Sequence, residues 1–297
     1  MTALPPPTKD QAFCNVSALE SGHLNLPLPI FLDNAAPGSA ILAPSLSFLL
    51  HHSKTDKKLV FDLGIRKDIE NAPPSVQKWI VAASFHTSVP QDVTESLTHG
   101  GLSPSDVDTV CISHCHWDHT GDTKPFVNSE FIVGAASASF FKPGYPEDPD
   151  SPFASDLLPQ GRTRFVELHE HPPLGPFPHA LDLYSDGSLY IVDAAGHLPG
   201  HLLLIARTSA DGAWILLGGD SAHHWNLITG ESKIADGRPG FPSGCAHLDK
   251  EAAELTIHRI REFWKLPRTR VILAHDEPWY KENKGGAAFW PGHIASK

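Results

Sequence analysis

Short apolar runs separated by glycine, proline and charged residues recur along the chain. The runs are five to seven residues long and rich in Val, Ile and Leu, which is typical of strands buried in a sheet. The pattern predicts strands over residues 45–50, 58–63, 108–113, 130–134, 189–193, 201–207, 213–217 and 269–274.

Helical spacing is clearest in residues 249–264, where Asp249 suits the N-cap position. The apolar residues of this stretch that recur near helical spacing are Ala252, Leu255, Ile260 and Phe263. A shorter helix is expected over 92–100, and residues 142–180, rich in Pro and Gly, predict a long surface loop without regular structure. The mixture predicts an α/β protein with one domain over 1–297, in which residues 1–12 form a mobile lead-in.

Residues 114–119 read His-Cys-His-Trp-Asp-His, an H-x-H-x-D-H arrangement with four metal-competent side chains. Two histidines at positions i and i+2 of extended backbone point to the same side, and the Asp-His pair can return around the next turn. Imidazole and carboxylate suit Zn²⁺ and similar ions. Four ligands exceed what one open catalytic ion needs from so short a segment, so a two-metal centre is favoured over a histidine-rich surface loop.

Three more candidate ligands follow apolar runs. His197 lies in Gly-His-Leu-Pro-Gly-His, Asp220 in Leu-Gly-Gly-Asp, and His275 after Val-Ile-Leu-Ala. Each alone has an ordinary structural explanation, but strand ends that share one rim can bring them together. The predicted assignment gives His114, His116 and His197 to one ion and Asp118, His119 and His275 to the second, with Asp220 bridging.

A net charge of −11 argues against a phosphate backbone as partner, and no Lys/Arg cluster offsets it. The apolar runs are too short to span a membrane, and the N-terminal residues lack the basic and apolar regions of a secretory signal. Four dispersed cysteines fit a reducing compartment. We therefore expect a cytosolic protein with no nucleic-acid or membrane partner; a homodimer remains open.

The ligand motifs, in this order and spacing, resemble those of the metallo-β-lactamase superfamily. The resemblance implies a four-layer αβ/βα sandwich with a di-metal site. It also implies that Asp62, in Phe-Asp-Leu-Gly, orients a ligand histidine, although a strand-end turn explains this residue equally well. His201 is usually not a ligand in this family and is assigned to packing or to the support of a ligand.

Within the superfamily, the chain is most similar to the N-acyl homoserine lactonases. Those enzymes often have a tyrosine three residues after the bridging aspartate, where this chain has His223. His223 could stabilise developing negative charge or protonate the leaving group, although a structural role is as well supported. Cys115 is expected to point away from the metals and to pack, with a reactive thiol as the lesser alternative.

Aromatic residues suggest a cleft for an apolar or aromatic small molecule. The substrate-contact candidates are Phe85, Trp225 and Trp279, and the cleft is expected to include Trp79, His86, Phe241, Trp290 and the 142–180 loop. For any one of these aromatics, a place in the core is the alternative.

The sequence thus predicts a hydrolase with two divalent ions, Zn²⁺ being the expected metal. A hydroxide bridging the ions attacks the carbonyl of a lactone or related cyclic amide, and Asp118 or a water carries the proton. Asp118, Asp220 and His223 are the predicted catalytic residues. The alternatives are a thioesterase and an iron-dependent redox enzyme on the same scaffold.

Overall fold

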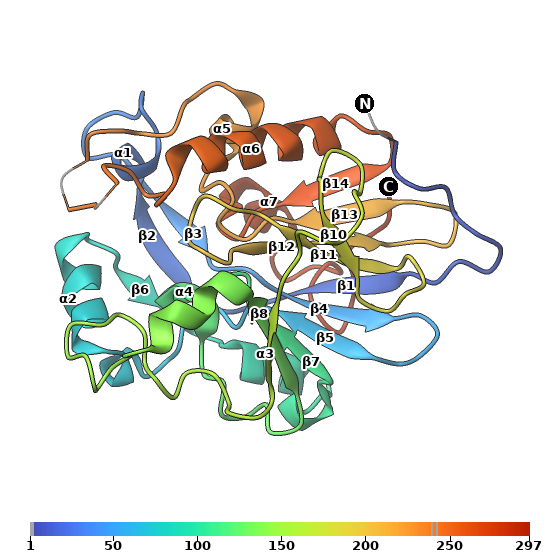
Figure 1. Ribbon diagram of the computed structural model, residues 1–297, viewed down its shortest axis with the longest axis horizontal. Helices are drawn as coiled ribbons and strands as arrows, with labels where there is room; N and C mark the ends of the chain where they lie inside the picture. Colours follow the sequence, from blue (N-terminus) through green and yellow to red (C-terminus); the bar gives the residue numbers. More distant parts are fainter. Residues whose placement is uncertain (1–2, 239, 242) are drawn as a thin grey trace.

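Two β-sheets face each other in the computed structural model of the protein, which describes residues 3–238, 240–241 and 243–297 (Figure 1). The first sheet has the strand order β1 (Cys14–Leu19), β4 (Ser47–His52), β5 (Lys58–Phe61), β7 (Thr109–Cys111), β8 (Glu130–Gly134) and β9 (Thr163–Val166). The second has the order β10 (Ala180–Asp182), β11 (Leu189–Asp193), β12 (Leu202–Arg207), β13 (Trp214–Leu217) and β14 (Thr269–Ile272).

Parallel strand pairs occur in both sheets. In the first sheet, β5, β7, β8 and β9 run parallel, and in the second sheet β13 and β14 do so. A small antiparallel sheet of β3 (Ala40–Pro44), β2 (His23–Pro27) and β6 (Thr87–Ser88) lies beside them. Since parallel strands end on the same edge of a sheet, the segments that follow them meet on one rim.

The helices pack outside the sheets or cap their ends. They are α1 (Leu28–Phe31), α2 (Pro74–Ala82), α3 (Val93–His99), α4 (Trp117–Thr120), α5 (Trp225–Thr229), α6 (Lys250–Trp264) and α7 (Glu277–Asn283), with 3₁₀ turns at Ile69–Asn71, Pro104–Asp106 and Ala135–Phe141. Asp249 caps α6 through Ala252 N, and Asp92 forms a capping box with Glu95 at α3. None of the helices within the described residues has the length and apolar character to cross a membrane.

Strand residues alternate between an inner and an outer core. On β12, Leu202 and Leu204 face the first sheet, whereas Leu203 and Ile205 belong to the outer cluster with α6. On the first sheet, Val60 and Val110 turn outward to pack with α3. Both faces of each sheet are therefore buried, and Figure 1 shows α6 and α3 on opposite outer sides of the sandwich. This is the predicted αβ/βα arrangement.

The strands and helices predicted from the apolar pattern are present, with ends shifted by a few residues. Two details were wrong. Residues 142–180 are not free of regular structure, because β9 and the start of β10 lie there and extend both sheets. Leu255 is 49% exposed, and α6 instead buries Ala253, Ile257, Ile260 and Phe263, so its buried face is rotated from the predicted one.

Leu204 is fully buried between the sheets, and Leu255 lies on the exposed face of α6. We expect Leu204→Ala to lower the free energy of unfolding by about 2–5 kcal/mol, because it leaves a cavity in the inner core. Leu255→Ala should change it by less than about 0.5 kcal/mol. Urea denaturation of the two variants tests this, and equal effects would contradict the assignment of the inner core.

Candidate metal centre

The H-x-H-x-D-H segment bends from the end of β7 into α4. His114 follows the end of β7, and His116 is the N-cap residue of α4, with extended backbone. Asp118 and His119 then fall in the first turn of the helix and are buried. The local backbone therefore brings all four side chains to one rim, as the motif predicted.

The other three candidate ligands reach this rim from the second sheet. His197 lies between β11 and β12, Asp220 follows β13, and His275 follows β14. Gly219 has a φ of +51°, and a Cβ there would lie 3.0 Å from His201 Nε2, so a larger residue would disturb the turn that aims Asp220.

One group of ligands surrounds the Oδ2 atom of Asp220. The Nδ1 atom of His116 lies 2.9 Å from His114 Nε2 and 3.0 Å from His197 Nε2. Asp220 Oδ2 lies 3.8 Å from His114 Nε2 and 3.5 Å from His197 Nε2. Two ligand atoms on one tetrahedral Zn²⁺ lie about 3.4 Å apart, so these separations suit a common ion.

The second group surrounds the Oδ1 atom of the same carboxylate. Asp220 Oδ1 is 3.2 Å from His119 Nε2 and 3.3 Å from His275 Nε2. Asp118 Oδ2 completes the group, 3.5 Å from His275 Nε2 and 3.9 Å from His119 Nε2. Each oxygen of Asp220 thus faces a different set of nitrogen ligands, which is the arrangement predicted for a bridging carboxylate.

Two buried atoms indicate that this space suits a cation. His119 Nε2 and Asp220 Oδ1 have no hydrogen-bond partner within the described residues, although they lie only 3.2 Å apart. Buried polar atoms without partners are costly, and an ion between ligands that face a common point would satisfy both. The donor set of imidazoles and carboxylates fits Zn²⁺ and related divalent ions, and it leaves the metal's identity open.

The electrostatics of the two groups differ. Burial holds the pKa of His114 and His197 well below the ordinary value and lowers the pKa of His116 to about 4, so these imidazoles are neutral. In the second group, burial also opposes the charged form, but Asp220 and Asp118 raise the pKa of His119 and His275 above the ordinary value. The acidic side of the centre therefore attracts positive charge.

Oxygen acceptors orient three of the ligand histidines from behind. His119 Nδ1–H donates to Asp62 Oδ2 at 2.8 Å, and Asp62 Oδ1 accepts from Ser113 N at 2.6 Å. His275 Nδ1–H donates to the Pro44 carbonyl at 2.8 Å, and His114 Nδ1 meets Ser113 Oγ at 3.0 Å. Asp62 thus has the supporting contact that the resemblance implied. His201, with no place in either group, accepts from Asp220 N–H at 3.1 Å.

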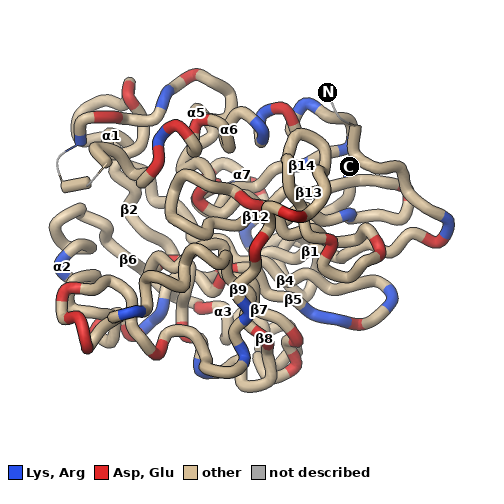
Figure 2. The backbone as a smooth tube through the Cα atoms, in the orientation of Figure 1, with Lys and Arg blue, Asp and Glu red and all other residues tan. Residues whose placement is uncertain are grey.

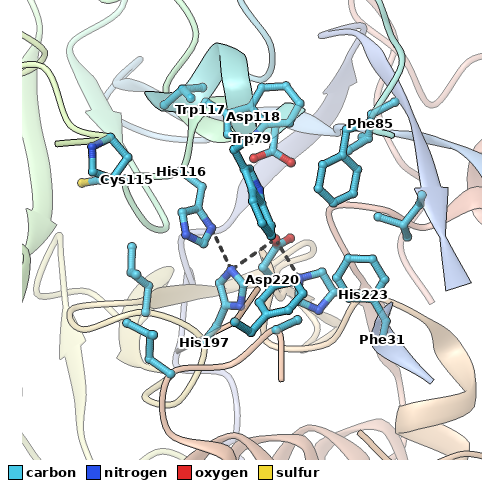
Figure 3. A pocket seen from close by; sticks show the side chains of 18 of the residues that line it. Phe31, Trp79, Phe85, Cys115, His116, Trp117, Asp118, His197, Asp220 and His223 are labelled. Carbon is cyan, nitrogen blue, oxygen red and sulfur yellow. Dashed lines mark hydrogen bonds and ion pairs between the residues drawn. The ribbon is translucent and has the colours of Figure 1, made fainter. Parts of the chain in front are cut away.

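A cavity of about 370 Å³ opens over these groups (Figure 3). His116, Asp118, His197, Asp220, His223 and His275 form its polar floor. Its wall is mostly apolar and includes Phe31, Trp79, Phe85, Trp117, Phe140, Phe153 and Phe241. His223 Nε2 lies 3.2 Å from Asp220 Oδ2, and the His223 ring stacks on Phe31 at 4.3 Å between centroids.

Some predicted wall residues lie elsewhere. Phe85, Trp79 and Phe241 line the cavity, whereas Trp225, Trp279, Trp290 and His86 are absent from the described residues that line it. Trp225 Nε1–H donates to Asp276 Oδ2 at 2.7 Å, and Trp279 packs on Phe289 in the inner core. Packing against these partners turns both tryptophans away from the cavity, so they are withdrawn as substrate contacts.

Cys115 lies at the edge of the cavity with its sulfur directed away from Asp220 (Figure 3). Its side chain is buried, and burial raises the pKa of the thiol to about 12. A thiol that stays protonated is a poor nucleophile, which agrees with the predicted packing role.

Several functional candidates were missed by the sequence analysis. Phe31 and Phe140 belong to segments that carry no recognisable motif, and only the fold places them on the cavity wall. His247 is buried beside His197 and His223 and forms a third group of possible ligands with them. Its position two residues before the N-cap of α6 is the only signal that could have drawn attention to it.

The sequence profile described as the metallo-beta-lactamase superfamily matches residues 42–275. The chain therefore belongs to this superfamily. A crystal structure of a Bacillus thuringiensis AiiA mutant with N-decanoyl-L-homoserine bound aligns with a TM-score of 0.72, covering 96% of this chain and 100% of that one. At 19% identity, this likeness concerns the fold.

Relatives of known sequence include metallo-hydrolase mfmC of Annulohypoxylon moriforme, 31% identical over 93% of this chain and 82% of its own length. Gamma-lactamase FDB1 of Fusarium pseudograminearum (strain CS3096) is 34% identical over 74% of this chain and 57% of its own length. Cytochrome P450 monooxygenase mpaDE' of Penicillium brevicompactum is 29% identical over 94% of this chain, which spans only 35% of that protein.

Asp62→Asn tests the support of the second ligand group. Asn tolerates the φ of +61° at this position but lacks the charge that holds His119. We expect about a 10- to 100-fold loss of Zn²⁺ affinity at one position, measured by chelator competition. Exposed Asp150→Asn is the control, and equal Zn²⁺ affinity in both variants would argue against this role of Asp62.

Proposed function

We propose that this protein holds two divalent ions, with Zn²⁺ as the expected metal, and hydrolyses a lactone or a related cyclic amide. The proposal rests on the geometry of the Asp220 carboxylate. Its Oδ2 and Oδ1 atoms face two separate ligand groups on the floor of an apolar cavity. All seven predicted ligands belong to these groups. Such a centre would supply a nucleophile at neutral pH and polarise a carbonyl.

Two side chains on the cavity floor are placed to handle protons and charge. Asp118 has one oxygen near His275 and faces the cavity, so it can carry a proton toward the leaving oxygen or nitrogen. His223 lies on the opposite side of Asp220 and can donate its Nε2–H to negative charge that develops on the substrate. Asp118, Asp220 and His223 are therefore the proposed catalytic residues.

The cavity favours a neutral substrate with an apolar or aromatic part. The described residues that line it include no Lys or Arg, and their only carboxylates belong to Asp118 and Asp220. Trp79 meets Phe241 edge-on at 5.2 Å between ring centroids, and Phe85 lies between Trp79 and Trp117 at 6.4 and 6.3 Å. An aromatic ring could stack or pack edge-on in such surroundings.

The names of the relatives agree with ring opening at a carbonyl. FDB1 is described as a gamma-lactamase and AiiA has an N-acyl homoserine bound at its active site, so a cyclic amide and a lactone are both supported as substrate classes. The sequence identities do not select between them. We propose that the preference for an ester or an amide substrate depends on whether His223 or Asp118 can reach the leaving oxygen or nitrogen.

A thioesterase is the enzymatic alternative. A carrier-bound thioester brings a phosphate-containing arm, which would require basic residues near the cavity, and none lines it among the described residues. Figure 2 shows Lys and Arg spread over the outer loops, interleaved with acidic residues, so a nucleic-acid partner is also disfavoured. An iron-dependent redox enzyme on this scaffold remains the third candidate, and metal analysis would identify it.

The first test is acid release by the zinc-loaded protein with homoserine lactones, aryl lactones, aryl lactams and acyl thioesters. We expect turnover of a lactone or lactam that is abolished by chelation and restored by Zn²⁺. Turnover of thioesters alone, or none with two ions bound, would contradict the proposed ring-opening activity.

Asp220→Asn removes the bridging charge at the centre. We expect the fold to remain, while most metal is lost from one position and nearly all turnover disappears, because an amide cannot serve both ions as a carboxylate does. Circular dichroism, metal analysis and the hydrolysis assay measure these three effects. Unchanged hydrolysis by this variant would exclude the bridging role.

Trp79→Ala tests the aromatic wall. Loss of the ring should raise KM for an aryl substrate about 10- to 100-fold, since burying such a side chain contributes roughly 1.5–3 kcal/mol. KM for a small unsubstituted lactone should change little. Trp264→Ala, on the outer surface of α6 and 40% exposed, is the matched control, and equal effects of both changes would contradict the assignment of this wall.

A further inference from the structure

His247 lies behind the cavity wall in the segment that leads into α6. Its side chain is 1% exposed, whereas its neighbours Ala246 and Leu248 line the cavity. Two backbone hydrogen bonds attach the segment to the ligand loop, from Leu248 N to the His197 carbonyl at 3.1 Å and from Asp249 N to the Gly196 carbonyl at 2.9 Å. The position of His247 relative to His197 is therefore set by the backbone.

A close approach by α6 reinforces this attachment. Gly196 has a φ of +131°, and a Cβ there would lie 2.3 Å from the backbone nitrogen of Ala253. The first turn of α6 can pack against the ligand loop only because this residue is glycine. The His247 ring is consequently held beside His197, with 5.2 Å between the ring centroids.

His197 differs from three other ligand histidines in its supporting contact. His114, His119 and His275 each have an oxygen atom of the protein at Nδ1, as described above. The Nδ1 atom of His197 is buried and has no hydrogen-bond partner within the described residues. Ligand histidines nearly always donate this second N–H to an acceptor, which fixes the tautomer that leaves the other nitrogen free for the ion.

His223, whose ring also adjoins that of His247, likewise has a buried ring nitrogen without a hydrogen-bond partner within the described residues. Its Nε2 is near Asp220, but its Nδ1 is buried and has no partner in the described part of the chain. His247 Nδ1 is also buried without a partner. One nitrogen from each of His197, His223 and His247 lies within 4.8 Å of the others, so the three rings that carry these partnerless atoms converge.

The ring spacing allows direct contact. The His247 ring centroid lies 5.2 Å from that of His197 and 5.2 Å from that of His223. In the same site, His114 and His116 at 4.6 Å, and His116 and His197 at 4.8 Å, bring nitrogens to 2.9 and 3.0 Å. A small rotation of the His247 ring would therefore bring its nitrogens into hydrogen-bond range.

A third metal ion is the competing explanation for three convergent imidazoles. It would add two positive charges to a buried site whose only carboxylates within the ligand groups are Asp118 and Asp220, which two ions already use. His197 would also have to coordinate two ions at once. Hydrogen bonding satisfies the same nitrogens without new charge, and the observations favour it.

We infer that His247 is a positioning residue that couples the tautomers of His197 and His223. One ring nitrogen of His247 accepts the Nδ1–H of His197, which leaves His197 Nε2 free for the ion. The other ring nitrogen donates its N–H to Nδ1 of His223, so that the proton of His223 resides on Nε2 and faces Asp220 and the cavity. The inference rests on the proposed function, because it assigns His197 to an ion.

The test compares His247→Leu with His247→Gln in the whole chain of residues 1–297. Leu removes both hydrogen-bonding groups, whereas the Gln amide offers an acceptor oxygen and a donor nitrogen. We expect His247→Leu to weaken one of two Zn²⁺ affinities about 10- to 100-fold in chelator competition. ¹⁵N NMR of the imidazoles should show that His223 loses its preference for the Nε2–H tautomer, and His247→Gln should largely restore both properties.

The controls separate this role from packing and from the proposed function. His258→Leu, at an exposed position of α6, should leave both readouts unchanged. Equal behaviour of the Leu and Gln variants, or a Leu variant with normal affinities and tautomers, would overturn the inference. Three Zn²⁺ ions in the wild type and two in His247→Leu would replace it with a cation site. A wild type that binds fewer than two ions would instead contradict the proposed function.

Discussion

The carboxylate of Asp220 is the group on which the rest of the site depends. It is buried, and each of its two oxygens faces one histidine from the first sheet and one from the second. That contact is possible only where the end of β13 meets the segment after β7, so the two sheets must pack with these ends on one rim. The sandwich core, with both faces of each sheet buried, provides the rigidity that keeps such a contact in place.

Burial gives the centre its chemical character. The first ligand group consists of imidazoles whose pKa burial lowers, so they are neutral and ready to coordinate at neutral pH. In the second group, burial is outweighed by Asp220 and Asp118, and the raised pKa of His119 and His275 reflects the need for positive charge. Beneath a largely apolar wall, a divalent cation would satisfy both groups.

The ligand histidines also differ in the atoms that contact their second ring nitrogen. His119 contacts a carboxylate, His275 a carbonyl and His114 a hydroxyl, whereas the Nδ1 atom of His197 has no hydrogen-bond partner within the described residues. His197 also adjoins His223, so a candidate metal ligand and the proposed proton donor belong to one buried cluster.

The sequence alone predicted the central strands, the helix α6 and the candidate ligands. H-x-H-x-D-H needs only one strand end and one helical turn to aim four side chains, and His197, Asp220 and His275 each follow an apolar strand. Such features are local, and Asp249 and Asp92 likewise cap their helices from within a few residues. Only the tertiary structure decided which aromatics line the cavity, why Trp225 and Trp279 do not, and that His247 adjoins His197. These contacts join segments far apart in the chain, and a side chain's partners there depend on packing that no local pattern records.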